Sequence, residues 1–267
     1  MRLPARHHGE DMMKKAICIL LLLCLPLSLA ACAGDPDAPT ADARTDVPIQ
    51  TTEQEEETMT EKASAAKLLY MGHASLRLTT PEGRVIYIDP YAGDGYGETA
   101  DLVLVTHSHF DHTALDKVAD RAPDCRVITW KEALSGGTHR TFDLGYVTVE
   151  AVEAGYNRNH SVKECVGYVL TLSDGVRVYV SGDTSKTKQM PALAEKQIDY
   201  AFFCCDGVYN MDLDEAAECA ALVGAKHNIP YHVIAASGSR TFDRARAEQF
   251  EAAGRLILEP GEEIELA

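Results

Sequence analysis

From residue 66 onward, the chain is a succession of short apolar runs separated by polar turns. Runs rich in β-branched and aromatic residues predict strands at 67–80, 84–91, 101–106, 125–130, 146–154, 166–174, 176–183, 198–207, 227–235 and 256–266. Amphipathic spacing and capping signals predict helices at 113–122, 131–136, 189–197, 212–225 and 240–254. The run at 101–106 is continuously apolar, which is typical of a strand covered on both faces.

The order of these elements indicates an α/β fold built from layers. Strands come first and then alternate with helices, which is the pattern of helices packed against sheets. The Asp174-Gly175 pair between two predicted strands is typical of a β-hairpin. The segment 65–267 has the usual size of one domain, about 200 residues.

The first 32 residues have the pattern of an export signal. Two lysines precede the apolar run "AICILLLLCLPLSLAAC", which is shorter than the about 20 apolar residues of a comfortable membrane span. Its end, Leu29 to Cys32, resembles the lipobox of bacterial lipoproteins, and this resemblance implies a lipid on Cys32. We therefore expect an exported protein, anchored to the bacterial cell envelope by that lipid. A plain cleaved secretory signal is the alternative.

Residues 33–64 are acidic and carry almost no large apolar side chains. Such a segment cannot bury enough surface to fold, so we expect a disordered tether. The whole chain has a net charge of −16, of which the leader contributes +2 and the tether −7, leaving −11 for residues 65–267. An acidic domain repels polyphosphate backbones, which disfavours nucleic acid as a partner.

Five cysteines remain in the predicted domain, namely Cys125, Cys165, Cys204, Cys205 and Cys219. None has CxxC spacing, and an odd number leaves at least one thiol unpaired. We expect no disulfide framework.

The strongest chemical signal is "THSHFDH" at 106–112, directly after an apolar run. His107 and His109 alternate with Ser108, so both imidazoles point to one side if the backbone is extended. Asp111 and His112 follow a bend at Phe110 and reach a second point nearby. Imidazoles with a carboxylate suit zinc and its first-row neighbours such as manganese and iron, whereas calcium and magnesium prefer oxygen ligands. The segment predicts half of a two-metal site.

Four residues cannot saturate two ions, so we expect further ligands at other strand ends. His160 in "YNRNHSV", Asp183 in "YVSGDTS" and His232 in "IPYHVIA" each follow or end an apolar segment. His227 competes with His232 for the last position, and the strand register favours His232. His73 in "GHAS" and Asp89 in "IDP" are expected to support the ligands from behind, since metal-bound imidazoles donate their free N–H to such groups. A structural role in turns is the alternative for both.

These motifs resemble the metallo-β-lactamase superfamily, whose HxHxDH motif matches His107, His109, Asp111 and His112. The resemblance runs from about residue 68 to 266. It implies an αββα four-layer sandwich, one divalent ion on His107, His109 and His160, another on Asp111, His112 and His232, and Asp183 between them. "YMGHASLRL", "VIYIDPY" and "GAKHNIPYH" further resemble the branch of L-ascorbate-6-phosphate lactonase-like and uncharacterised metal-dependent hydrolases. Asp183 stands where classical β-lactamases place a cysteine ligand, which disfavours β-lactam hydrolysis.

Two such ions, most plausibly zinc, lower the pKa of a shared water toward about 7 and so produce hydroxide. Asp111 orients the attacking oxygen and then passes on a proton. We expect a hydrolase acting on an ester, lactone or phosphodiester bond of a small molecule. The alternatives are a non-catalytic lipoprotein that binds a metal or solute, and a nuclease of the same fold. Loss of a ligand would favour the first, and a basic face the second; neither is seen in the sequence.

Overall fold

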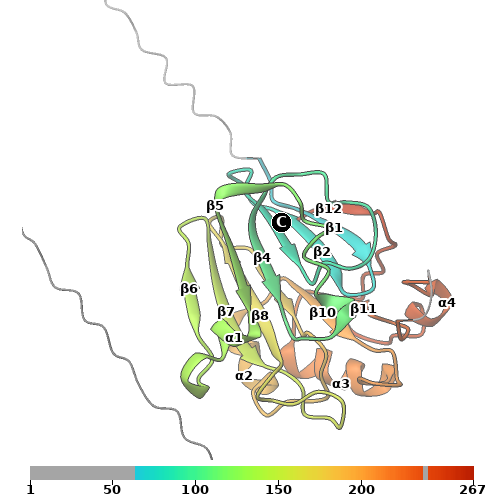
Figure 1. Cartoon of the computed structure of the whole chain (residues 1–267). Coiled ribbons are helices and arrows are strands. Elements are labelled where there is room, and N and C mark those ends of the chain that lie inside the picture. The colour runs from blue at the N-terminus through green and yellow to red at the C-terminus, as the bar shows by residue number, and fades with distance from the viewer. Residues whose placement is uncertain (1–63, 237–239) are drawn as a thin grey trace, which may run out of the picture. The chain divides into compact units, whose positions relative to one another are not determined.

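The computed structural model describes residues 64–236 and 240–267 (Figure 1). The predicted leader at 1–32 with Cys32, and the tether up to residue 63, lie outside the described residues, so both stay predictions. The described strands form two six-stranded sheets. Among the described residues, no helix has the length and hydropathy to span a membrane.

The first sheet has the strand order β12-β1-β2-β3-β4-β5. Its members are β1 (Lys67–Gly72), β2 (Ser75–Thr79), β3 (Val85–Ile88), β4 (Ala100–Val105), β5 (Arg121–Thr129) and β12 (Glu263–Glu265). The pairs from β12 to β3 are antiparallel, and β3, β4 and β5 run parallel.

The second sheet has the order β11-β10-β9-β8-β7-β6. Its members are β6 (Thr141–Asp143), β7 (Val147–Glu153), β8 (Val166–Leu172), β9 (Arg177–Val180), β10 (Tyr200–Cys204) and β11 (His227–Tyr231). The pairs from β6 to β9 are antiparallel, and β9, β10 and β11 run parallel.

The helices are short and lie outside the sheets. They are α1 (Trp130–Ala133), α2 (Met190–Leu193), α3 (Leu213–Val223) and α4 (Arg244–Ala247), with 3₁₀ turns η1 (Phe110–His112), η2 (Ser135–Gly137) and η3 (Ala194–Lys196). α3 begins at the Asp212 cap, which accepts a hydrogen bond from the Glu215 amide, and ends at Gly224 with a φ of 66°. Figure 1 shows α2 and α3 together beside the second sheet. The predicted αββα sandwich is confirmed.

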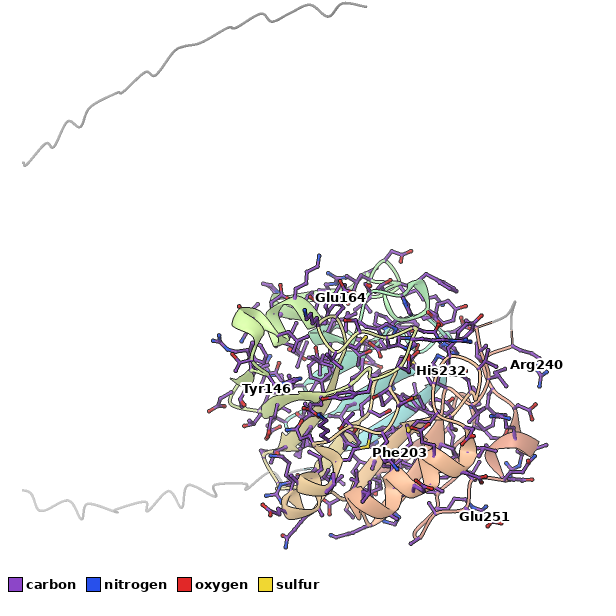
Figure 2. The ribbon with its side chains drawn as sticks, turned by 90° about the horizontal axis from the view of Figure 1, so that it is seen from below. Tyr146, Glu164, Phe203, His232, Arg240 and Glu251 are labelled. Atoms are coloured by element: carbon purple, nitrogen blue, oxygen red, sulfur yellow. The ribbon has the colours of Figure 1, made fainter. Side chains whose placement is uncertain are left out.

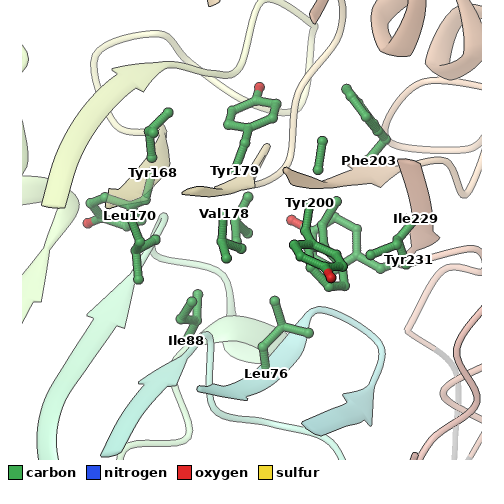
Figure 3. Close-up of a cluster of buried hydrophobic side chains, with 14 of the residues drawn as sticks. Leu76, Ile88, Tyr168, Leu170, Val178, Tyr179, Tyr200, Phe203, Ile229 and Tyr231 are labelled. Carbon is green, nitrogen blue, oxygen red and sulfur yellow. The ribbon is translucent and has the colours of Figure 1, made fainter. Parts of the chain in front are cut away.

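The core lies between the sheets, and strand alternation decides which side chains enter it. On β3, Ile86 and Ile88 join this core, whereas Val85 and Tyr87 belong to a second apolar cluster on the outer face. Figure 3 shows Ile88 facing Leu170 across the core. Fully burying each such side chain stabilises the fold by roughly 1.5–3 kcal/mol.

The predicted strand at 67–80 is wrong in one respect, because it is a hairpin of β1 and β2. The chain turns at Gly72, whose φ is 106°, and at His73, whose φ is 51°. A Cβ at Gly72 would lie 2.8 Å from the Thr241 hydroxyl, so the close approach of another segment fixes this glycine. The turn carries His73 to the edge of the sheet.

The predicted helix at 113–122 is also wrong, since β5 begins at Arg121 and pairs with Ala100. The Arg121 guanidinium donates to the carbonyls of Leu115 and Val118, which a helix would have used internally. Leu115 and Val118 instead cover the outer face of the first sheet. Tertiary contacts therefore override the local helix pattern.

The predicted helix at 240–254 shrinks to α4, because the following segment pairs with β11. Arg255 forms a β-bridge with Asn228, and the Leu256 amide donates to the Asn228 carbonyl. At Gly254, whose φ is 62°, a Cβ would lie only 2.0 Å from the Lys226 carbonyl oxygen. This crossing requires an extended chain and excludes a longer helix.

Candidate metal centre

The common direction of several strands explains how residues far apart in the sequence meet at one edge of the sandwich. β1, β3 and β4 run the same way in the first sheet, and so do β7, β9, β10 and β11 in the second. The segments that follow their C-terminal ends carry, in chain order, His73, Asp89, His107 to His112, His160, Asp183, Asp206 and His232. The contacts described below join these segments at a single edge of the sandwich. Figure 2 shows His232 within the layers and Arg240 at the periphery.

Three imidazoles form the first part of the cluster. Donor atoms of His107, His109 and His160 lie within 4.8 Å of one another. His109 Nδ1 lies 3.2 Å from His160 Nε2. Asn157 fixes the His160 ring, because its Oδ1 lies 3.1 Å from His160 Nδ1 and accepts the His160 amide at 2.9 Å.

The second part contains Asp111, His112 and His232, with His73 beside them. His232 Nε2 lies 3.9 Å from Asp111 Oδ2. His73 Nε2 lies 2.9 Å from the same oxygen, and the His73 and His232 rings contact each other at a tilt of 41° with centroids 3.7 Å apart. His73 therefore supports Asp111 and His232 together.

Asp183 stands between the two parts. Its Oδ2 lies 3.3 Å from His160 Nε2 and 3.4 Å from His232 Nε2, and its Oδ1 lies 3.5 Å from His112 Nε2. His107 Nε2 lies 3.9 Å from Oδ2. The structure thus brings all seven predicted ligands together, within the distances that a shared site requires.

Asp89 is fully buried behind His112. Its Oδ2 accepts hydrogen bonds from His112 Nδ1 at 2.8 Å and from the Thr106 hydroxyl at 2.7 Å, while Oδ1 accepts the Thr106 amide at 2.8 Å. When the ring is neutral, the bond to Nδ1 fixes the tautomer that leaves His112 Nε2 without a proton and facing Asp183. The expected supporting position of Asp89 matches this contact.

Sequence reasoning missed a second supporting network. Asn210 Nδ2 donates to Asp183 Oδ2 at 2.8 Å and to Asp206 Oδ2 at 2.7 Å. Asp206 Oδ2 also lies 3.5 Å from His232 Nδ1, so this carboxylate faces the ring from behind without the close hydrogen bond that Asp89 makes to His112. Asp206 follows an apolar strand, as Asp183 does, and that position was the signal that could have identified it.

The His227 alternative is not supported by position. His227 begins β11, and its ring stacks on Tyr200 with centroids 4.8 Å apart. His232 follows the other end of the strand. Among the described residues, the metal-ligand clusters include His232 and leave out His227.

The charges of the cluster favour a cation. Burial lowers the pKa of His107 well below its ordinary value, and burial and the His232 ring lower the pKa of His73 to about 4. Burial opposes ionisation of Asp111, but the hydrogen bond from His73 and the charges of His112 and His232 together outweigh it and hold the pKa of Asp111 below its usual range. Burial also disfavours a charge on His112, yet the carboxylates around it raise its pKa to about 9. The ionised Asp111 thus lies near neutral His73 and His107, while His112 carries a proton that a cation would displace.

The donor atoms fit a metal ion. Among the described residues, Nε2 of His107, His112 and His232 and Oδ1 of Asp183 are buried without a hydrogen-bond partner. Such atoms are costly unless something binds them. Two donors on one tetrahedral zinc lie roughly 3.3 Å apart, because each bond is about 2.0 Å long. The observed separations of 3.2–3.5 Å around Asp183 and His160 match this value.

Five of the seven predicted ligands, all except His107 and His112, line a cavity of about 350 Å³. The lining residues are His109, Phe110, Asp111, Asn159, His160, Asp183, Tyr209, His232 and Ala236. A small molecule fits a space of this size. The described cysteines take no part, since Cys125, Cys165, Cys204, Cys205 and Cys219 are all unpaired thiols, as expected, and none lines the cavity.

Comparison with known proteins agrees with this centre. The model of the beta-lactamase superfamily domain matches residues 67–232. The chain belongs to the metallo-β-lactamase superfamily. A UPF0173 metal-dependent hydrolase of Rubrobacter xylanophilus is 29% identical over 241 residues, covering 76% of this chain and 98% of that protein. One from Pyrococcus furiosus is 27% identical over 230 residues, covering 75% and 99%.

Two solved structures share the fold. A crystal structure from Parabacteroides distasonis has a TM-score of 0.57 at 28% identity and covers 70% of this chain and 90% of that chain. Igni18, a metallo hydrolase from Ignicoccus hospitalis, has a TM-score of 0.56 at 19% identity and covers 75% and 98%. The relatives confirm the prediction of a metal-dependent hydrolase at the level of the family, and the lactonase-like branch stays a prediction.

Proposed function

We propose that this protein is a hydrolase of small molecules that uses two divalent first-row metal ions, with zinc as the expected metal, to cleave an ester, lactone or phosphodiester bond. The observation that carries the proposal is the convergence of seven donor side chains at one site, five of them lining the cavity, with four buried donor atoms that have no partner among the described residues. Such atoms are stabilised by a bound cation. A binding protein that had lost catalysis would not need this complete set.

Each part of the set has a distinct task. His107, His109 and His160 would hold one ion, and Asp111, His112 and His232 the other. Asp183 would contact both, because its Oδ2 lies near His160 and its Oδ1 near His112. When bound, the two ions lower the pKa of a water from 15.7 toward about 7 and polarise the scissile bond.

Asp111 is the residue of this chain that moves a proton. Its carboxylate lines the cavity and is kept ionised by the hydrogen bond from His73 to Oδ2 together with the charges of the surrounding histidines. It can therefore accept a proton from the attacking water and deliver it to the leaving oxygen. The water oxygen forms the new bond, the bond to the leaving group breaks, and the products are an acid and an alcohol.

The proposal extends to location, which rests on sequence alone. The lipobox-like end of the leader at Cys32 and the acidic tether at 33–64 would place the domain outside the cytoplasmic membrane. Labelling of cells with a palmitate analogue tests this, and a Cys32→Ala variant that still incorporates the label would contradict it.

The test combines metal analysis with activity. The full-length protein should contain bound first-row metal and hydrolyse members of a panel of esters, lactones and bis(p-nitrophenyl) phosphate. Asp183→Asn should lose metal and at least a hundredfold in kcat/KM. A wild-type protein purified without metal, which also takes up none on addition of zinc, manganese or iron, would overturn the proposal.

Asp199→Asn is the matched control. Asp199 is also buried, accepts a backbone hydrogen bond from Arg177 at 2.8 Å, and pairs with Lys226 outside the metal cluster. Its replacement should lower stability while metal content and kcat/KM stay within about twofold of the wild type. An equal loss in both variants would mean that general destabilisation explains the effect.

A further inference from the structure

Exposed apolar side chains are concentrated around the metal centre. Among the described residues, five large hydrophobic side chains are exposed, namely Phe110, Tyr156, Val162, Val208 and Tyr209. All five lie on three segments that carry site residues, 107–112, 156–162 and 206–211. The other large hydrophobic side chains among the described residues are more than half buried. An apolar surface gathered around a cavity marks a ligand-binding region.

Phe110 and Tyr209 line the cavity itself. Phe110 is 69% exposed. Its ring contacts the Tyr91 ring edge to face, with the ring centroids 5.8 Å apart. The Tyr209 amide donates to Asp206 Oδ1 at 2.7 Å, and its carbonyl accepts from Asn159 Nδ2 at 3.2 Å. The backbone of Tyr209 is therefore fixed, and two aromatic side chains lie at the mouth of the site, where an apolar group can pack.

The cavity carries no positive side chain among the described residues that line it. Protein sites for phosphate esters normally supply arginine, lysine or a helix N-terminus to the anionic oxygens. Arg158 and Lys163 lie on the loop of His160, but both are exposed and neither lines the cavity. The net charge of −11 on residues 65–267 adds to the repulsion of anions. Beyond the metal ions, nothing in the lining compensates a charged substrate.

Resting on the function proposed above, we propose that the substrate is an uncharged carboxylic ester or lactone whose apolar group packs against Phe110 and Tyr209. Its carbonyl would face Asp183 and Asp111 on the floor. Water adds its oxygen to the carbonyl carbon, the bond to the alkoxy oxygen breaks, and that oxygen takes a proton. The cavity of about 350 Å³ holds about a dozen water-sized groups, so a chain of several carbons fits beside the reacting group.

A homologous series of substrates tests this preference. Methyl acetate, butyrate and hexanoate are compared by pH-stat titration with the full-length, metal-loaded protein, and bis(p-nitrophenyl) phosphate is assayed beside them. Each added methylene that is buried should raise kcat/KM by about fourfold until the cavity is full. γ-Nonalactone should likewise exceed γ-butyrolactone. A flat series, or faster cleavage of the phosphodiester, would overturn the inference.

Variants locate the apolar contact. Phe110→Ala and Tyr209→Ala should flatten the series, lowering kcat/KM for hexanoate about tenfold or more and for acetate less than threefold. Phe110→Leu and Tyr209→Phe should restore most of the chain-length dependence. Metal content is measured in each variant, because Phe110 lies between two predicted ligands. Val162→Ala is the control, since Val162 is exposed but does not line the cavity.

The outcomes separate this inference from the proposed function. Absence of metal, or no hydrolysis of any substrate, defeats the proposed function itself. Hydrolysis without dependence on chain length defeats the inference alone. If Val162→Ala falls together with Phe110→Ala, and activity rises only when phospholipid vesicles are added, the apolar segments contact membranes and the substrate inference is wrong.

Discussion

Replacement of Asp89 by asparagine isolates the effect of one buried carboxylate on the metal centre. Asparagine has the same shape and tolerates the left-handed conformation of this position, where φ is 46°. The carboxylate accepts three hydrogen bonds, from the Thr106 amide, the Thr106 hydroxyl and His112 Nδ1. A side-chain amide has one oxygen, so either the Thr106 amide or His112 Nδ1 must then face an N–H group.

Two quantities set the expected size. A buried hydrogen bond to a charged group contributes about 1.5–3 kcal/mol. The rise in the pKa of His112 from 6.5 to about 9 corresponds to roughly 3 kcal/mol at about 1.4 kcal/mol per unit, and Asp89 shares this effect with Asp183 and Asp111. We therefore expect Asp89→Asn to destabilise the metal-free protein by roughly 2–4 kcal/mol. Its metal affinity should fall about 10–100-fold, because His112 is no longer held in the metal-binding tautomer.

Thermal unfolding and chelator competition measure the two effects separately. For a domain of this size, the loss should lower Tm by roughly 5–15 °C in the metal-free protein. Asp199→Asn should lower Tm as well, but it should leave metal affinity within twofold of the wild type. Wild-type metal affinity in Asp89→Asn would refute the reasoning that this carboxylate sets the state of His112.

Two further predictions concern neighbouring groups. Asn210→Ala removes the hydrogen bonds to Asp183 and Asp206 and should lower kcat/KM about tenfold. The control is Asn228→Ala, which loses two hydrogen bonds to backbone carbonyls outside the site and should change stability only. Equal losses of kcat/KM in both variants would contradict the prediction. The raised pKa of His112 means that its protonation stabilises the metal-free protein fully below about pH 6.5 and that this stabilisation is lost as pH rises through about 9. Metal binding at pH 7.5 should therefore release about one proton from His112, measured by calorimetry in buffers of different ionisation enthalpy, and no release would contradict this assignment.

The sequence carried most of the site because its ligands follow a simple geometric rule. Strands that run in one direction end at one edge, so polar residues directly after apolar runs converge there. This rule identifies His160, Asp183 and His232, although His160 and His232 are 72 positions apart in the sequence. Asp206 also follows an apolar run, but its segment contains no histidine or other motif that would have indicated a role in the site.

The wrong elements share another cause. The segments 113–122 and 240–254 have helical patterns, but their backbone groups find better partners elsewhere in the fold. Arg121 binds the carbonyls of the first segment, and β11 pairs with the end of the second. Such partners are distant along the chain, so local periodicity does not reveal them.

The metal content of the native full-length protein, measured by mass spectrometry for the wild type, His232→Ala and His227→Ala, tests the central claim most directly. The two histidines lie at opposite ends of the same strand, and of these two only His232 belongs to the metal-ligand cluster. We predict about two ions per chain in the wild type and in His227→Ala, and one or fewer in His232→Ala. Equal metal content in all three proteins, or none in the wild type, would contradict the account.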